Sequence, residues 1–383
     1  MMFAKIDLLM KKLEDRANEK QEVMHIHDSR MTCEECGNTG NSGNSCPEIH
    51  EDVNFVNNNY FHPQQNQGWN QQQRPNYQGF TPSDHDPALF IHTSSHGCTL
   101  ILLYVDDMLI TGDDSDYITF VKERLYEQFM MFDLGSLSYF LGIEIASTAD
   151  GYYLSQSKYT QELIAHSALT DTRTAATPME LNLHLKPMNG LPLEDPTWYH
   201  HLVGSFVYLT ATRLDIAYPV HTLSQFVKAP TTVHYAHLLH VLCYLRGTIS
   251  RQLFYATSSQ PMLHAYSDAT WASDHVERLS ITGYCIFLGG SPIAWKSKRQ
   301  SAVSRSSAEA ELRALATTIA EIIWLLWLLA DFGVTCADPT ILRCDNTSAI
   351  QIANNPVKHE LTKHIGVDAC FVRSHCQQST IDL

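Results

Sequence analysis

Two apolar runs on either side of a short polar break form the most regular pattern in the chain. The stretch from Leu100 to Asp114 is LILLYVDDMLITGDD, and the adjacent acids Asp106 and Asp107 lie in its middle. This pattern predicts a buried β-hairpin whose turn carries the two carboxylates. Neighbouring carboxylates repel each other and are costly to desolvate, so such a turn favours a cation or strong donors beside it. An ordinary Asp-rich surface turn is the alternative interpretation.

The pattern outside this hairpin alternates between helix and strand. Apolar spacing predicts an amphipathic helix over residues 3–26 and a second helix over Tyr117–Met130. Residues 138–145, SYFLGIEI, favour strand, and residues 198–247 favour helices. Pro219 falls inside the last of these patterns, where an interior proline costs a helix about 3 kcal/mol.

In the last third of the chain, acids lie at the ends of two predicted strands and on a predicted helix. Residues 262–272 predict a strand ending in Asp268, residues 282–300 a hairpin, and residues 340–346 a strand ending in Asp345. Between them, SRSSAEAELRALATTIAEIIWLLWLLADFG predicts a long helix. Ser306 and Glu309 fit a capping box at its start, so Glu309 has a structural role. Glu311 has no such capping role. Taken singly, each of Asp268, Glu311 and Asp345 is better interpreted as a solvated surface acid.

Composition bounds the class of protein. The 383 residues predict two or three domains, and 44% hydrophobic with 17% charged residues is typical of a globular chain. The formal net charge of −15 is unlike that of a protein that binds nucleic acid over its whole surface. Basic residues gather mainly around Lys296, Lys298 and Arg299. We expect these three to contact a nucleic-acid backbone, with a solvated hairpin end as the alternative.

Cysteine usage and hydropathy predict the compartment. Seven of the ten cysteines are scattered in or beside apolar runs, which is typical of free thiols in a reducing environment. Lysines and an aspartate interrupt the apolar residues at the N-terminus, and the apolar tract from Ile319 to Ala330 is short for a bilayer. We expect an intracellular protein, cytoplasmic or nuclear, that is neither secreted nor bound to membranes.

The Tyr-Val-Asp-Asp hairpin resembles the palm motif of reverse transcriptases. The flanks MLITGDD and FDLGSLSYFLGIEI resemble the polymerase of copia-type retrotransposons. The resemblance implies that Asp106 and Asp107 descend from a polymerase metal site. It also implies a partner aspartate on an earlier palm strand, and nothing similar occurs before Leu100. We therefore predict no DNA synthesis by this chain alone, and an open sheet edge with an exposed core where palm is missing.

Residues 262–373 resemble the ribonuclease H domain of the same elements. The resemblance implies two Mg²⁺ or Mn²⁺ ions held by Asp268, Glu311 and Asp345, and hydrolysis of RNA paired with DNA. Family members usually carry a further acid after His-Ile near the end of the domain, where this chain has Gly366. Asp368 is the candidate fourth carboxylate. His364 could assist product release or be a plain surface histidine.

Three cysteines near the N-terminus resemble a Gag zinc knuckle. Cys33, Cys36 and Cys46 have the knuckle spacing, but Asn41 stands where the family has a histidine ligand. An amide replaces imidazole poorly on zinc, so we expect a degenerate Zn²⁺ site that has lost most of its affinity and its fold. Residues 53–82 are rich in Asn, Gln, Gly and Pro, which predicts a disordered linker. Its sequence resembles the Gag region of gypsy-type elements.

Together these patterns predict an α/β (α+β) chain with a disordered N-terminal segment. The expected parts are a Gag-like segment (1–52), the linker (53–82), a partial reverse transcriptase palm (83–197), a helical connection (198–257) and a ribonuclease H-like domain (258–383). The predicted function is metal-dependent hydrolysis of RNA in RNA–DNA hybrids, with RNA–DNA hybrid or another nucleic acid as partner. A catalytically silent transposon relic with weak nucleic-acid binding is the alternative, and the oligomeric state stays open.

Overall fold

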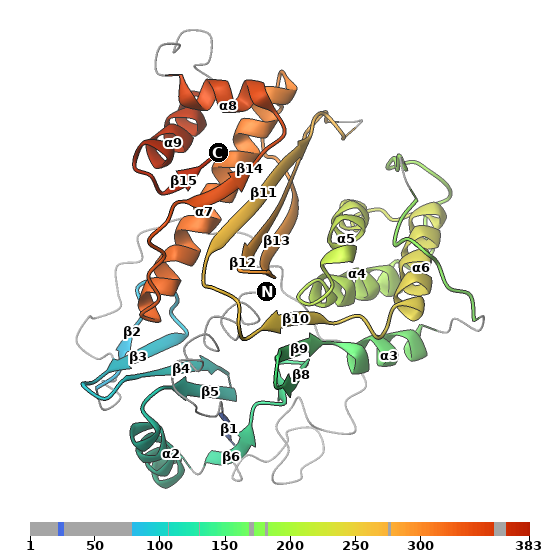
Figure 1. Ribbon diagram of the computed structural model, residues 1–383. Coiled ribbons are helices and arrows are strands. Elements are labelled where there is room, and N and C mark those ends of the chain that lie inside the picture. Colours follow the sequence, from blue (N-terminus) through green and yellow to red (C-terminus); the bar gives the residue numbers. More distant parts are fainter. Residues whose placement is uncertain are drawn as a thin grey trace, which may run out of the picture. The chain divides into compact units, whose positions relative to one another are not determined.

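The computed structural model describes eight segments of the chain, drawn in colour in Figure 1: residues 22–26, 79–105, 107–129, 131–167, 172–180, 183–274, 277–355 and 365–383. They form two compact units, one within residues 16–137 and one that contains residues 138–383. The chain mixes helices with several sheets, as the sequence predicts. Asp106, the three knuckle cysteines and His364 lie outside the described residues.

In the described part of the first unit, an antiparallel sheet packs against helix α2 (Ser115–Phe129). Its strands, in spatial order, are β2 (Thr81–Pro82), β3 (Leu89–Thr93), β4 (Cys98–Tyr104), β5 (Asp107–Gly112), β1 (Glu22–Ile26) and β6 (Met131–Ser136). The predicted hairpin is confirmed, because β4 and β5 pair from Thr99 opposite Gly112 to Tyr104 opposite Asp107. Helix α2 (Ser115–Phe129) buries Ile118, Val121 and Leu125 against the sheet.

Strand β1 corrects the helix expected near the N-terminus. Residues 22–26 were expected to end an amphipathic helix, yet they pair with β5 on one side and β6 on the other. Pairing with two partners outweighs the weak local preference of so short a segment. On the β5 side, His25 lies opposite Asp107 in the ladder, and the outer strands of the described sheet are β2 and β6. Residues Thr81–Pro82, expected to end the linker, belong to β2.

The last two acids of the LILLYVDDMLITGDD stretch have structural roles. The Asp114 carboxylate accepts a hydrogen bond from the Tyr117 backbone N–H at 3.1 Å, which caps the first turn of α2. The Asp113 carboxylate accepts one from the Cys98 backbone N–H across the hairpin. These contacts fix where the hairpin ends and where the helix begins.

The second unit begins, along the chain, with a second sheet and a group of helices that share a core. The sheet has the order β10-β9-β8-β7, with β7 (Tyr139–Phe140), β8 (Ile143–Thr148), β9 (Gly151–Ser155) and β10 (Leu253–Ala256). The helical elements are α3 (Ser157–His166), α4 (Thr197–Leu209), the 3₁₀ turn η2 (Leu214–Ile216), α5 (Ala217–Ser224) and α6 (Thr232–Gly247). Their shared core includes the fully buried Tyr199, Phe206 and Leu238.

The structure removes the expected cost of Pro219. The helical pattern breaks at η2 and resumes at Ala217, so Pro219 is the third residue of α5. A proline in the first turn of a helix removes an N–H that would have no partner within the helix. Pro219 is therefore compatible with a stable α5, and it does not mark a damaged fold.

A five-stranded mixed sheet with three helices completes the second unit. The order is β13-β12-β11-β14-β15, from β11 (Leu263–Thr270), β12 (Ile281–Leu288), β13 (Ser291–Arg299), β14 (Thr340–Arg343) and β15 (Ile381–Asp382). Pairing is antiparallel from β13 to β11 and parallel from β11 to β15. Helix α7 (Ser307–Asp331) packs along this sheet, and α8 (Thr347–Asn354) and α9 (Gly366–Gln377) pack beside it (Figure 1). Strand β11 runs two residues beyond Asp268, where it was expected to end.

Helix α7 confirms the long helix predicted within residues 304–333, and it contains the apolar tract Ile319–Ala330. Within the described part of the chain, it is the helix long and apolar enough to cross a membrane, and half of that apolar window is buried inside the protein. Its buried residues include Leu312, Leu315, Ile319, Ile322 and Leu325. This spacing gives the helix a stripe that packs on the sheet, as core helices of globular proteins do.

The turn between β7 and β8 gives a test of the fold. Leu141 and Gly142 both have positive φ, +47° and +73°, and a Cβ on Gly142 would lie 1.8 Å from the Tyr208 hydroxyl oxygen. We expect Gly142→Ala to lower the free energy of unfolding by about 1–3 kcal/mol, because it adds strain and a clash. Urea denaturation measures the change.

Gly204→Ala, in the middle of α4, is the matched control. A Cβ there meets nothing within 4 Å, and Ala favours helix over Gly by about 0.5–1 kcal/mol. Equal effects of the two substitutions would contradict the described turn.

Candidate metal centre

Three alanines let α7 begin close to the end of β11. Ala269 of β11 packs on Ala310 and Ala314 of α7, and all three are buried. Side chains this small allow a helix and a strand to approach closely. One hydroxyl contact extends the junction, because the Thr318 hydroxyl lies 3.1 Å from the Ser267 hydroxyl oxygen. Glu311 directly follows Ala310 in α7, and its side chain is thereby directed at the end of β11.

The Glu311 carboxylate is buried and held at both oxygens. Its side chain is 4% exposed. Oε1 accepts a hydrogen bond from the Ala269 backbone N–H at 3.0 Å, and Oε2 lies 3.8 Å from the Cys344 thiol sulfur. One contact comes from β11 and the other from the residue that follows β14. The carboxylate therefore sits where these two parallel strands separate.

Two further acids act on Glu311. Asp268 is the exposed residue before Ala269 in β11, and Asp345 is the exposed residue after Cys344. Ligand atoms of Glu311, Cys344 and Asp345 all lie within 4.8 Å of one another. Asn346 then caps α8 by accepting a hydrogen bond from the Ala349 backbone N–H at 3.0 Å. Glu311 and Asp345 thus come within ligand distance of each other, and Asp268, directly before Ala269 in β11, is near enough for its charge to act on Glu311.

Burial changes the chemistry of Glu311. Burial, together with the negative charges of Asp268 and Asp345, raises the pKa of this carboxyl group to about 7. The Ala269 N–H acts in the opposite direction. Carboxylate oxygens are ligands that Mg²⁺ and Mn²⁺ prefer, so these three acids fit divalent cations.

The fourth predicted acid has different neighbours. Asp368 lies in the first turn of α9, with its carboxylate 4.0 Å from an Arg313 guanidinium nitrogen. Burial raises the pKa of Asp368, Arg313 lowers it, and the charge of Glu309 raises it. The charged groups that act on Glu311 are Asp268 and Asp345 instead. Asp368 therefore belongs to the Glu309–Arg313 side of α7.

Glu309 has the structural role expected of it, with one change of partner. The Ser306 hydroxyl accepts a hydrogen bond from the Glu309 backbone N–H at 3.2 Å. The Glu309 carboxylate accepts one from the backbone N–H of Arg305 at 2.8 Å rather than from Ser306, and it pairs with Arg313 at 2.9 Å. Glu309 thus ties down the start of α7, and Glu311 is the acid that faces β11.

The predicted basic contacts lie along β13. Lys296 and Lys298 are exposed residues two positions apart, so they share one face of the strand. The Arg299 guanidinium pairs with Asp274 at 2.9 Å and with Glu277 at 3.1 Å.

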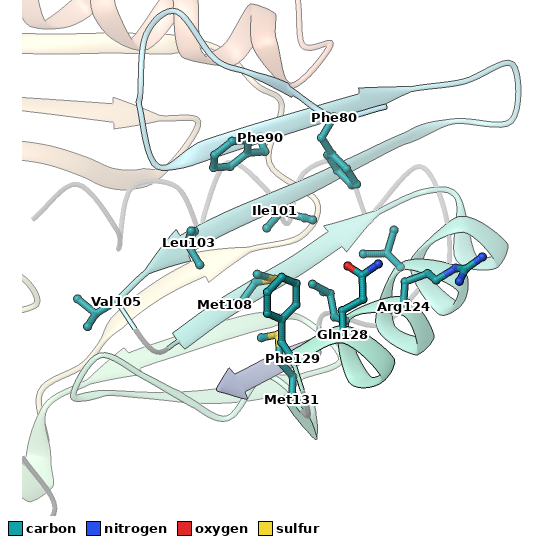
Figure 2. Close-up of a pocket in the computed structure, with 12 residues that line it drawn as sticks. Phe80, Phe90, Ile101, Leu103, Val105, Met108, Arg124, Gln128, Phe129 and Met131 are labelled. Carbon is teal, nitrogen blue, oxygen red and sulfur yellow. The ribbon is translucent and has the colours of Figure 1, made fainter. Parts of the chain in front are cut away.

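Asp107, the described acid of the Asp-Asp pair, belongs to the first unit, whereas the carboxylate cluster belongs to the second unit. Asp107 opens β5, and the exposed Val105 occupies the turn with φ +47°. An apolar pocket of about 170 Å³ lies between this sheet and α2. Figure 2 shows its walls, among them Phe80, Phe90 and Phe129. None of the described residues that line it is acidic, so it offers no metal site.

Sequence reasoning missed Cys344. It was grouped with the scattered thiols, although its position next to Asp345 at a strand end was the available signal. The backbone N–H of Ala269 was also missed, because no sequence pattern shows where a helix touches a strand. Both contacts depend on the close approach of α7 to β11.

Comparison with known proteins gives a family match for the part of the chain around the Asp-Asp hairpin. The family model "Reverse transcriptase (RNA-dependent DNA polymerase)" matches residues 54–181. This range begins upstream of residue 83, inside the stretch predicted to be a linker. It contains the Asp-Asp hairpin.

Several curated proteins are similar over more of the chain. A retrovirus-related Pol polyprotein from transposon RE2 of Arabidopsis thaliana is 40% identical over 303 residues, 79% of this chain and 21% of that protein. An uncharacterized mitochondrial protein of Arabidopsis thaliana is 40% identical over 58% of this chain and 93% of its own length. A putative transposon Ty5-1 protein of Saccharomyces cerevisiae is 32% identical over 64% and 80%. The chain spans about a fifth of the length of the Pol polyproteins it matches.

The raised pKa of Glu311 predicts how stability depends on pH. A carboxyl group whose pKa is about 7 in the folded state, above its ordinary value of 4.5, destabilises the folded state as pH rises through that window. Glu311→Gln removes the ionisation. Without metal, we expect this variant to exceed the parent by up to about 3 kcal/mol in free energy of unfolding at pH 8, and to match it near pH 4.

Urea denaturation in EDTA at the two pH values checks this expectation. Glu162→Gln, at an exposed site on α3, is the control and should follow the parent at both. A Glu311→Gln advantage that is the same at pH 4 and pH 8 would show that the carboxyl group is not the cause.

Proposed function

Since this chain belongs to the family of copia-type retrotransposon Pol polyproteins, we propose that it cleaves RNA in RNA–DNA hybrids at Asp268, Glu311 and Asp345. The observation that carries the proposal is the convergence of these three carboxylates from β11, α7 and the end of β14. The five-stranded mixed sheet supports the proposal. Its strands, hairpin and long helix, with a further strand after the helix, follow the order expected of a ribonuclease H fold.

The protein's own residues prepare the site. The Ala269 N–H fixes one oxygen of Glu311, and the packing of three alanines fixes the helix that carries it. Asp268 and Asp345 are exposed beside the buried Glu311, so the cluster opens to solvent on one side. The three carboxylates would hold two Mg²⁺ or Mn²⁺ ions. When bound, such ions activate water and neutralise charge on the leaving oxygen.

Substrate contacts follow from charge and shape. Lys296 and Lys298 on β13 offer cations to the phosphate backbone, which supplies most of the affinity for nucleic acid. Selectivity for RNA would come from its 2′-hydroxyl groups and from the shape of the hybrid. The high negative charge of the rest of the chain confines such contacts to a small area.

The reverse transcriptase part is a polymerase by ancestry, and such domains generally use divalent metal ions and bind nucleic acid. We propose that it makes no DNA in this chain alone. The family's second aspartate should come from an earlier palm strand. In β1, the strand beside the Asp-Asp hairpin, His25 lies opposite Asp107, and the acid of this strand, Glu22, lies opposite Ile110 at the other end. A two-metal site needs carboxylates from both strands.

Cleavage of a labelled RNA–DNA hybrid by the full chain tests the nuclease. We expect cutting that requires Mg²⁺ or Mn²⁺ and that falls by at least about 100-fold in Asp345→Asn, because one shared metal ligand is lost. Asp338→Asn, an exposed acid before β14, should keep the parent's rate. Duplex DNA should stay intact.

The outcome separates the two functional hypotheses. If a chain shown to be folded by circular dichroism leaves the hybrid intact with either metal, the silent-relic alternative replaces the nuclease. If Asp338→Asn and Asp345→Asn lose activity equally, the cluster is not the active site.

The basic face of β13 predicts a change in salt dependence. Lys298→Ala should weaken hybrid binding and reduce the slope of log affinity against log salt by about 1, because one phosphate contact is lost. Fluorescence anisotropy at several salt concentrations measures the slope. Lys158→Ala, at an exposed position of α3, is the control and should leave the slope unchanged.

A further inference from the structure

A thiol lies inside the carboxylate cluster. The Cys344 sulfur is 3.8 Å from Glu311 Oε2, and ligand atoms of Cys344, Glu311 and Asp345 lie within 4.8 Å of one another. The proposed hydrolysis uses only oxygen ligands, so it leaves this sulfur without a role. Cys344 forms no disulfide and is half-buried, and it lies beside the exposed Asp345.

The three side chains are held from different directions. Glu311 is fixed through its other oxygen by the Ala269 N–H at 3.0 Å. Cys344 and Asp345 lie between β14 and α8, and the Asn346 cap fixes the chain directly after them. A ligand set that is already assembled loses little freedom when a cation binds. The arrangement therefore offers one sulfur and two carboxylate groups at a defined place.

Sulfur changes which cation such a site prefers. Mg²⁺ binds oxygen ligands, whereas Zn²⁺ and Cd²⁺ bind thiolate sulfur strongly and accept carboxylate beside it. Three protein ligands with an open fourth position are a common arrangement for zinc. Binding of such a cation would release the thiol proton to solvent, with no change of oxidation state.

We propose that Cys344, Glu311 and Asp345 form a binding site for a thiophilic divalent cation such as Zn²⁺, and that this cation competes with Mg²⁺. Competition follows because Glu311 and Asp345 would serve both cations. The binding part of the proposal stands on the three side chains alone. Its consequence, inhibition of cleavage, rests on the proposed nuclease function.

Cobalt binding tests the site without any cleavage. The full chain is used in a Cys33→Ser, Cys36→Ser, Cys46→Ser background, which removes the other cysteine cluster as a source of signal. Titration with Co²⁺ should give a thiolate-to-cobalt charge-transfer band that Zn²⁺ abolishes. We expect Cys344→Ser to remove this band and Glu311→Gln to weaken the affinity at least about tenfold.

Cys370→Ser is the matched control, because Cys370 is an exposed thiol on α9. Its band should equal that of the background. A Cys344→Ser variant with an unchanged band overturns the proposed site. So does a background protein that shows no band while circular dichroism shows it to be folded.

Inhibition of cleavage separates this inference from the nuclease proposal. For each variant, the Zn²⁺ concentration that halves its own Mg²⁺-dependent rate is measured. Cys344→Ser should raise that concentration at least about tenfold, and Cys370→Ser should leave it unchanged. A cobalt band without cleavage supports the cation site while the nuclease fails. Cleavage with equal inhibition in both variants supports the nuclease while the competing site fails.

Discussion

The close contact between α7 and β11 is the constraint on which the candidate centre depends. Ala269, Ala310 and Ala314 are small enough to bring the helix against the strand, and the Ala269 N–H then meets Glu311. A larger residue at any of the three positions would move the helix and separate the carboxylates. The chemistry proposed for this chain is therefore set by packing as much as by the acids themselves.

Several elements could be predicted because local pattern decides them. The apolar runs around the Asp-Asp pair gave the β4–β5 hairpin, and the spacing after it gave α2 within two residues. Ser306 and Glu309 predicted the start of α7. For the site, the resemblance of residues 262–373 to a ribonuclease H domain implied that Asp268, Glu311 and Asp345 form a cluster.

The remaining features depend on contacts that no local pattern contains. Strand β1 is a strand only because β5 and β6 lie on both sides of it, so its helical spacing was misleading. Pro219 was judged as an interior proline because the break at η2 has no strong sequence signal. Cys344 belongs to the centre because its sulfur, directly after β14, lies beside the Glu311 carboxylate of α7. That contact depends on how the helix packs on the sheet, which no local pattern shows.

Strand β1 also constrains the order in which the first unit assembles. It occupies an interior position of the sheet, yet its neighbours β5 and β6 come more than 80 residues later in the chain. The β4–β5 hairpin needs only local contacts, whereas inserting β1 closes a long loop, whose entropic cost precedes any gain from pairing. During synthesis, residues 22–26 must therefore wait until Ser136 has been made before both of their edges are paired.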